Sequence, residues 1–261
     1  MSQRTSYTQG TPNWADLLTT DPDAAKSFYG QLFGWTYDDV PMPEGPVYSM
    51  AVVDGSAVAA IAPQPPDMAA QGVPPAWHTY LAVDDVDEVI ARVEPAGGKV
   101  LMAPFDVMHA GRMAFVTDPT GAAVGLWQAR AHIGATRVNE PGAMTWNHLM
   151  TDNESAAVAF YHQVLGLTTG TVDFDEGPHT IFISGEDTVA GIAAARPGVP
   201  NHWHVYFAVE DAADAARRAS ELGGTVVHGP MDTPIGVMAA LRDPQGGVFS
   251  VFAPNVTRSS G

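Results

Sequence analysis

The stretch Trp77-His78-Thr79-Tyr80-Leu81-Ala82-Val83-Asp84-Asp85 occurs a second time as Trp203-His204-Val205-Tyr206-Phe207-Ala208-Val209-Glu210-Asp211. The surrounding sequence repeats as well, with Phe28-Tyr29 matched by Phe160-Tyr161 and Asp118-Pro119 matched by Asp243-Pro244. An internal repeat at a nearly constant offset indicates a duplicated structural unit. We therefore predict two copies of one domain, at residues 8–130 and 143–256, joined by a linker at 131–142.

The first copy contains two rounds of one strand, one helix and three strands. Alternating apolar residues predict a strand at 14–19, and Asp21-Pro22 precedes a helix at 24–33. Strands at 47–53 and 57–62 flank Asp54-Gly55, which is a strong hairpin signal. A proline-rich loop at 63–75 follows. The second round then consists of a strand at 77–83, a helix at 84–95 and strands at 99–103, 112–117 and 122–128.

The composition narrows the classes of function. Of 261 residues, 46% are hydrophobic and none is cysteine, which is typical of a globular protein without disulfide bonds or a cysteine-rich metal site. The formal charge of −17 argues against nucleic acid and anionic membranes as partners, because phosphate binding relies on Lys and Arg. The polar start Met1-Ser2-Gln3-Arg4 lacks an apolar signal core, and no apolar run approaches membrane-span length. We therefore expect a cytoplasmic protein.

The order of these motifs resembles a known family. A first strand, a helix ending in Phe-Tyr and Leu-Phe-Gly, a His-x-x-x-Ala-Val strand and an Asp-Pro-x-Gly turn together resemble the vicinal oxygen chelate superfamily of glyoxalases, bleomycin-resistance proteins and extradiol dioxygenases. The runs at 10–14 and 200–204 are similar to the tandem glyoxalase-like proteins of actinobacteria, a group that includes a mycobacterial culture-filtrate antigen and whose members are often labelled hydroxylases. The resemblance implies an α+β fold of tandem duplicated βαβββ units, forming two eight-stranded half-barrel cups with helices outside.

The resemblance also assigns metal-ligand positions, on the first, fifth and last strands and on the fourth. In this chain they are Trp14, His78 and Gly125 in the first copy, Trp146, His204 and Ser250 in the second, and positions near Ala60 and Gly191. Only the histidines among them bind divalent metals well, and an octahedral or facial-triad site needs at least three nitrogen or oxygen ligands. We therefore expect no metal cofactor. The alternative is a divalent metal held by His148, His202 and His204, which strand periodicity places on one face.

The period of two in a strand sorts the remaining side chains between faces. We expect Trp77 and Trp203 to pack beneath the helices. The concave faces are predicted to carry Trp14, Asp16, Leu18, His78, Tyr80, Gly125 and Trp127 in the first copy, and Trp146, His148, Met150, His202, His204, Tyr206, Ser250 and Phe252 in the second.

Convergent rings with a few polar groups are typical of a small-molecule site. The expected ligand is apolar or aromatic, with a few polar groups, and His78 with Asp16, or His204 with His148, are candidate general bases. We predict either ligand binding and sequestration or a metal-free conversion such as hydroxylase-type chemistry, and the sequence leaves open whether the protein is an enzyme. The alternatives are a metal-dependent lyase or dioxygenase with a His-rich second site, and an interaction protein with an empty cup. The two copies are expected to pair within the chain or as a homodimer.

Overall fold

A computed structural model of the protein describes residues 3–41, 45–174 and 177–255. The first copy contains β1 (Pro12–Thr19), α1 (Pro22–Phe33), β2 (Thr36–Val40), β3 (Tyr48–Val53), β4 (Ser56–Pro63), α2 (Pro66–Ala70), β5 (Ala76–Ala82), α3 (Val86–Val93), β6 (Lys99–Val107), β7 (Gly111–Thr117) and β8 (Ala123–Ala129). The second contains β9 (Met144–Thr151), α4 (Glu154–Leu165), β10 (Thr168–Phe174), β11 (Gly177–Ser184), β12 (Asp187–Ala194), β13 (His202–Ala208), α5 (Ala212–Glu221), β14 (Thr225–Thr233), β15 (Gly236–Arg242) and β16 (Val248–Pro254). None of the helices in the described ranges has the length and apolar character needed to cross a membrane.

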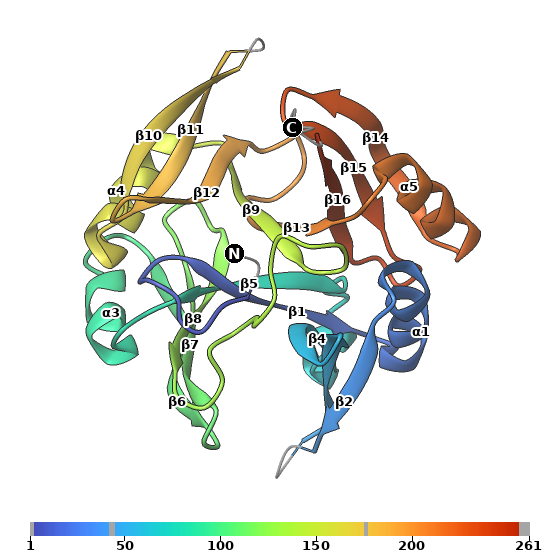
Figure 1. Ribbon diagram of the computed structural model, residues 1–261. Helices are drawn as coiled ribbons and strands as arrows, with labels where there is room; N and C mark the ends of the chain where they lie inside the picture. Colours follow the sequence, from blue (N-terminus) through green and yellow to red (C-terminus); the bar gives the residue numbers. More distant parts are fainter. Residues whose placement is uncertain (1–2, 42–44, 175–176, 256–261) are drawn as a thin grey trace.

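Each copy forms its own eight-stranded sheet (Figure 1). The strand orders are β2-β3-β4-β1-β5-β8-β7-β6 and β10-β11-β12-β9-β13-β16-β15-β14. The first and fifth strands of a copy pair antiparallel at the centre of its sheet, and the first strand also pairs parallel with the fourth. The predicted fold of tandem βαβββ units in two eight-stranded sheets is confirmed.

Two elements of the first copy were not predicted. Strand β2 is polar and mostly exposed at the sheet edge, so it lacks the apolar alternation that identifies a half-buried strand. Helix α2 is a five-residue turn inside the predicted proline-rich loop and buries no side chain. The predicted end of the second domain at residue 256 lies outside the described residues.

The helices fill the space between the convex faces of the two sheets. Helix α1 packs beside α5, and α3 packs beside α4, at the two sides of the molecule (Figure 1). Each apolar core therefore mixes residues of both copies: one joins Phe28 and Leu17 to Phe207, and the other joins Val89 to Phe160. The two copies thus complete each other's hydrophobic cores.

A reciprocal pair of buried polar clusters joins the copies. Tyr29 in α1 donates to Asp243 Oδ2 at 2.8 Å and accepts from Trp77 Nε1 at 2.9 Å. Tyr161 in α4 holds the matching position: it accepts from Trp203 Nε1 at 2.8 Å, and burial together with the nearby charge of Asp118 raises its pKa. Both carboxylates lie in the repeated Asp-Pro-x-Gly turns, whose backbone amides they also bind. The predicted position of both tryptophans beneath the helices is confirmed.

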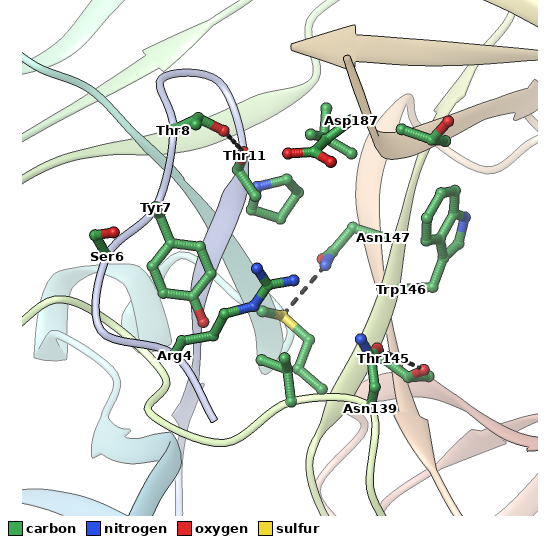
Figure 2. A pocket seen from close by; sticks show the side chains of 15 residues that line it. Arg4, Ser6, Tyr7, Thr8, Thr11, Asn139, Thr145, Trp146, Asn147 and Asp187 are labelled. Atoms are coloured by element: carbon green, nitrogen blue, oxygen red, sulfur yellow. Dashed lines mark hydrogen bonds between the residues drawn. The ribbon is translucent and has the colours of Figure 1, made fainter. Parts of the chain in front are cut away.

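The N-terminal segment 3–11 crosses from the linker to the second copy. Arg4 N bonds Thr136 O at 2.9 Å, and Ser184 Oγ donates to Gln9 O at 2.7 Å. Together with residues of the linker, β9 and β12, this segment lines a half-open cavity of about 300 Å³ (Figure 2). The cavity lies between the copies, so the duplication creates a concave site that neither sheet has alone.

The linker docks against the concave face of the first copy. Ala135 N bonds Asn13 O at 2.7 Å and Thr136 N bonds Ala57 O at 2.9 Å. Gly134 has φ of 105°, and a Cβ there would lie 2.3 Å from Asn13 O, so only glycine fits this close approach. The segment was predicted as an unstructured connection, and its docking was not expected.

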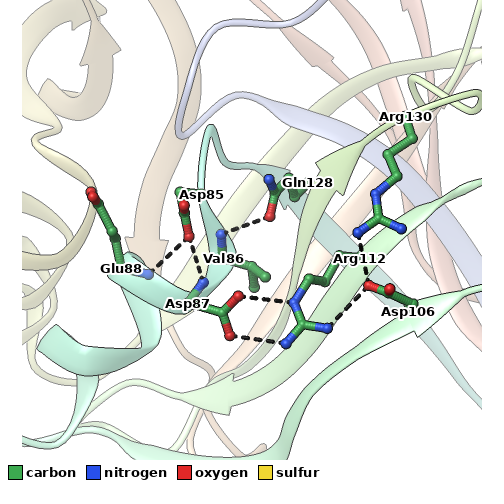
Figure 3. A network of polar contacts seen from close by, with 8 residues as sticks. All are labelled: Asp85, Val86, Asp87, Glu88, Asp106, Arg112, Gln128 and Arg130. Carbon is green, nitrogen blue, oxygen red and sulfur yellow. Dashed lines mark hydrogen bonds and ion pairs between the residues drawn. The ribbon is translucent and has the colours of Figure 1, made fainter.

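A charged network anchors the start of the linker. Arg130 bonds Asp106 of β6 at 2.9 Å, and Arg112 of β7 joins Asp106 to Asp87 in the first turn of α3 (Figure 3). Arg112 contacts both oxygens of Asp87, which is the bidentate geometry that guanidinium groups favour. The network therefore holds the point at which the chain leaves the first sheet.

Candidate functional site

The concave face of the first copy carries a buried carboxylate beside an imidazole. Asp16 on β1 lies directly opposite His78 on β5, and the distance from Asp16 Oδ1 to His78 Nδ1 is 3.4 Å. Asp16 is 3% exposed. Neither atom has a hydrogen bond within the described part of the chain, so this contact is the polar interaction they share. The predicted pair is therefore brought together.

Two phenols bind the other oxygen of Asp16. Tyr80 OH donates to Oδ2 at 2.8 Å, and Tyr48 OH donates to it at 3.1 Å while accepting from Trp14 Nε1 at 2.8 Å. Burial, and then the charge of Asp16, raises the pKa of both tyrosines well above the usual range, so both remain donors. The phenols leave Oδ1 as the oxygen available to His78.

The linker covers one end of this face. Ala135 and Val138 join a buried cluster with Trp14 and Trp127, which are 4% and 7% exposed. His132 of the linker lies edge-on to Trp14, with ring centres 4.6 Å apart, and burial lowers its pKa to about 4. The two tryptophans were predicted to bind ligand, but here their rings are covered by the chain itself.

The second copy places imidazoles on the matching strands. His148 on β9 lies opposite His204 on β13, and Tyr206 lies opposite Trp146 and beside Ser250. The Tyr206 ring stands edge-on to both imidazoles, at centroid distances of 5.2 Å and 5.1 Å. The predicted second-copy face is therefore assembled around Tyr206.

Burial keeps both of these imidazoles neutral. It lowers the pKa of His148 to about 4 and, with help from neighbouring His202, that of His204 to about 3. His204 Nε2 lies 2.8 Å from Ser250 Oγ, and His148 Nε2 accepts from Trp146 Nε1 at 3.3 Å. A base with so low a pKa takes up few protons at pH 7, so these side chains suit hydrogen bonding better than proton abstraction.

The remaining second-copy residues lie toward the edge of the same face. Met150, His202 and Phe252 are half-buried. His202 Nδ1 contacts Pro200 O at 2.8 Å, and its ring lies edge-on to His204 at 5.7 Å. Trp146 and His148 are also half-buried, so the second face keeps accessible ring surface beside its buried polar groups.

The donor set does not fit the superfamily's metal. Within the described ranges, no group of three or more His, Asp or Glu side chains is arranged to hold a metal ion, and the proposed triad of His148, His202 and His204 is not such a group. Trp146 and Ser250 stand at the other predicted ligand positions, and the His148 ring lies over Gly191 at the fourth-strand position. An indole and a glycine supply no metal ligand, and no carboxylate is predicted on this face.

Two side chains on these faces were not predicted, and one glycine was expected only as a fourth-strand metal-ligand position. Tyr48 reaches Asp16 from β3, and His132 reaches the first face from the linker. Gly191 makes room for His148, because a Cβ there would lie 2.2 Å from the imidazole carbon Cδ2. Tyr48 shares strand parity with Met50, but parity alone does not say which face of the sheet that pair occupies. The sequence carries no comparable signal for His132.

Curated relatives match nearly the whole chain. A protein of Mycobacterium tuberculosis named "Putative glyoxylase CFP32" is 56% identical over 258 residues, covering 97% of this chain and 98% of its own. The anthracycline biosynthesis protein DnrV of Streptomyces peucetius is 40% identical, covering 95% of this chain and 94% of its own.

Solved structures share the fold. The Mn(II)-bound glyoxalase of Novosphingobium aromaticivorans has a TM-score of 0.64 at 20% identity, covering 94% of this chain and 83% of its own. The 2,3-dioxygenase LapB of Pseudomonas sp. KL28 has a TM-score of 0.65 at 16% identity, covering 94% and 93%. The sequence model of one family matches residues 11–126 and 143–251. With this match in both copies, the chain belongs to the glyoxalase/bleomycin resistance protein/dioxygenase superfamily.

Proposed function

We propose that the protein binds a small planar aromatic metabolite on the concave face of its second copy, without a metal ion. The observation that carries the proposal is the pair of neutral imidazoles, His148 and His204, which lie opposite each other and both contact the Tyr206 ring. Aromatic surface beside a few fixed polar groups is the usual composition of a small-molecule site. The linker covers the equivalent end of the first copy, which favours the second as the binding face.

The chemistry of this face suits a ligand with aromatic rings and oxygen substituents. The half-buried Trp146 offers a ring for stacking, and neutral imidazole and hydroxyl groups both donate and accept hydrogen bonds. Phenol and quinone oxygens match such groups without needing a charge on the protein. The relative named for anthracycline biosynthesis supports this class, since anthracyclines are polycyclic hydroxyquinones.

A metal-free conversion is the second candidate, favoured by the Asp16–His78 contact. An Asp16 Oδ1 that accepts from His78 Nδ1–H would leave the Nε2 lone pair free to take a proton from a bound ligand. The tyrosines on Oδ2 would hold the carboxylate in place. If this pair acts, His78→Gln lowers turnover of a phenolic substrate at least 100-fold, measured by chromatography of the product. The control is Gln31→Ala, at an exposed position of α1, which should leave turnover unchanged.

One binding experiment separates the metal-free proposal from a metal-dependent lyase or dioxygenase. The probe is 1,8-dihydroxyanthraquinone, titrated into the protein with and without EDTA, with metal content measured by mass spectrometry. We expect binding that EDTA leaves unchanged. His204→Leu should weaken it about tenfold, because a ligand hydrogen bond worth about 1.4 kcal/mol is lost.

The first copy supplies the matched control. His78 occupies the position equivalent to His204, so His78→Leu should change the affinity less than twofold. One equivalent of tightly bound metal that disappears in His204→Leu, or binding abolished by EDTA, would overturn the metal-free proposal. Equal losses in the two variants would overturn the assignment to the second copy.

A further inference from the structure

The cavity between the two copies carries two opposite charges that do not meet. Arg4 of the N-terminal segment and Asp187 at the start of β12 both line it. Figure 2 shows them apart, with Asp187 above and Arg4 below in this view and the Tyr7 ring beside Arg4. Among the described residues neither side chain has an ion-pair partner, and the two do not approach within ion-pair distance of each other.

The N-terminal segment that forms one wall of the cavity is held at both ends. Tyr7 OH donates to Ala135 O at 2.6 Å, and the Arg4 guanidinium lies 5.8 Å from the centre of the Tyr7 ring. Gln9 bonds Leu165 O at 3.2 Å, which fixes the other end of the segment to the second copy. A preformed wall reduces the entropy lost when a ligand is ordered.

A buried amide also points to a ligand. Asn147 lines the cavity and is 2% exposed. Its Oδ1 accepts from Thr79 at 2.8 Å, but its Nδ2 donates to Met144 Sδ at 3.2 Å, and a thioether is a weak acceptor. A buried amide nitrogen with so weak a partner gains when a ligand oxygen replaces the sulfur.

We infer that this cavity binds a small zwitterion, most simply an aromatic α-amino acid. The ligand carboxylate pairs with Arg4 and accepts from Asn147 Nδ2, while its ammonium pairs with Asp187. Its side chain lies against the Tyr7 ring, which also lines the cavity. A ligand that carries both charges bridges the space between Arg4 and Asp187. The cavity volume of about 300 Å³ is at the lower end of the range for small-molecule sites.

The test uses L-phenylalanine and two analogues that each lack one charge, 3-phenylpropionate and 2-phenylethylamine, in calorimetric titrations of the full chain. We expect L-phenylalanine to bind at least tenfold more tightly than either analogue. Arg4→Gln should weaken phenylalanine and phenylpropionate at least fivefold and leave phenylethylamine unchanged. Asp187→Asn should show the opposite selectivity. Arg92→Gln and Glu186→Gln, which remove the same charges outside the cavity lining, should change nothing.

Three results would overturn the inference: no binding of phenylalanine at millimolar concentration, equal binding of the single-charge analogues, or affinities unaffected by both cavity variants. Binding of 1,8-dihydroxyanthraquinone to the second-copy face is measured on the same variants. Arg4→Gln and Asp187→Asn should leave it unchanged, so failure of the zwitterion site and failure of the aromatic site are distinguishable.

Discussion

The two concave faces share one backbone framework but differ in charge and cover. In the first copy, β1 places Asp16 opposite His78, two phenols bind the carboxylate, and the linker covers the adjoining tryptophans. In the second, β9 places His148 opposite His204, and both are neutral beside accessible rings. A single exchange at the equivalent position, Asp16 for His148, therefore separates a face built around a carboxylate from one built around neutral imidazoles.

The largest expected difference between the faces is their response to acid. The folded pKa values of His148 and His204 lie below the value of about 6.5 in the unfolded chain, so the unfolded state gains protons first as the pH falls. Each histidine then removes about 2 kcal/mol of stability between pH 7 and pH 5, or about 4 kcal/mol together. Urea unfolding at both pH values measures this loss. The His148→Gln/His204→Gln variant should lose about 4 kcal/mol less unfolding free energy than the wild type between pH 7 and pH 5.

Other buried groups titrate in both proteins and cancel in that comparison. His132 adds to the acid sensitivity, while the raised pKa values of Asp118 and Asp243 oppose it. The exposed His228→Gln variant is the control for removing a histidine, and it should keep the wild-type pH dependence. If the double variant keeps the wild-type pH dependence, the imidazoles of His148 and His204 are not held neutral in the wild-type protein.

The second difference is rigidity, and two glycines test it. A Cβ at Gly125 or at Gly191 would lie 2.2 Å from a ring atom, of Tyr80 in the first copy and of His148 in the second. Tyr80 is buried and bonded to Asp16, so Gly125→Ala should cost about 3 kcal/mol of unfolding free energy. His148 is half-buried and freer to turn, so Gly191→Ala should cost about 1 kcal/mol. Equal losses in urea unfolding would contradict the contrast.

The third difference is the cover over the first face. Gly134→Ala combines the cost of a positive φ with contact against Asn13 O, so we expect a loss of about 2 kcal/mol and faster hydrogen exchange at the Ala135 and Thr136 amides. Gly198→Ala, with φ of 80° and free space around it, should cost about 1 kcal/mol without changing that exchange. Protected amides in the Gly134 variant would mean that the linker stays docked.

The smallest effect concerns the hydroxyl beside His204. Ser250→Ala removes the contact with His204 Nε2, which should cost about 1 kcal/mol in urea unfolding. The first copy has Gly125 in the equivalent place and lacks this interaction. Ser220→Ala on the exposed side of α5 should stay within about 0.5 kcal/mol. If the Ser250 variant is no less stable than that control, the Ser250 hydroxyl does not stabilise the second face.

Strand periodicity predicted which side chains share a face, because β1, β5, β9 and β13 are buried against helices on one side only. It therefore placed Trp77 beneath the helices and His148 with His204. Periodicity could not place Tyr48, because its contact with Asp16 depends on which strands pair. Strand β4 lies between β1 and β3, so that Asp16 and Met50 both lie beside Ala60. Edge strand β2 buries too little apolar surface to leave a pattern.

The linker and the N-terminal segment were beyond prediction for another reason. Their positions depend on surface complementarity with folded sheets, and irregular segments carry no periodicity. Gly134 occupies a position that only the docked conformation explains. The linker covers the first face, and both segments line the cavity at Arg4. The repeat alone therefore could not predict these parts of the candidate sites.

The hydrogen bond from Tyr29 to Asp243, and the matching placement of Tyr161 beside Asp118, bear on how such a chain can evolve. Each copy carries half of two buried pairs, so neither copy can drift freely or be deleted alone. Compensating substitutions should couple codons more than 200 positions apart in the first pair and about 40 apart in the second. Two half-length chains separated within 131–142 retain every member of both pairs, and should associate with each other when coexpressed.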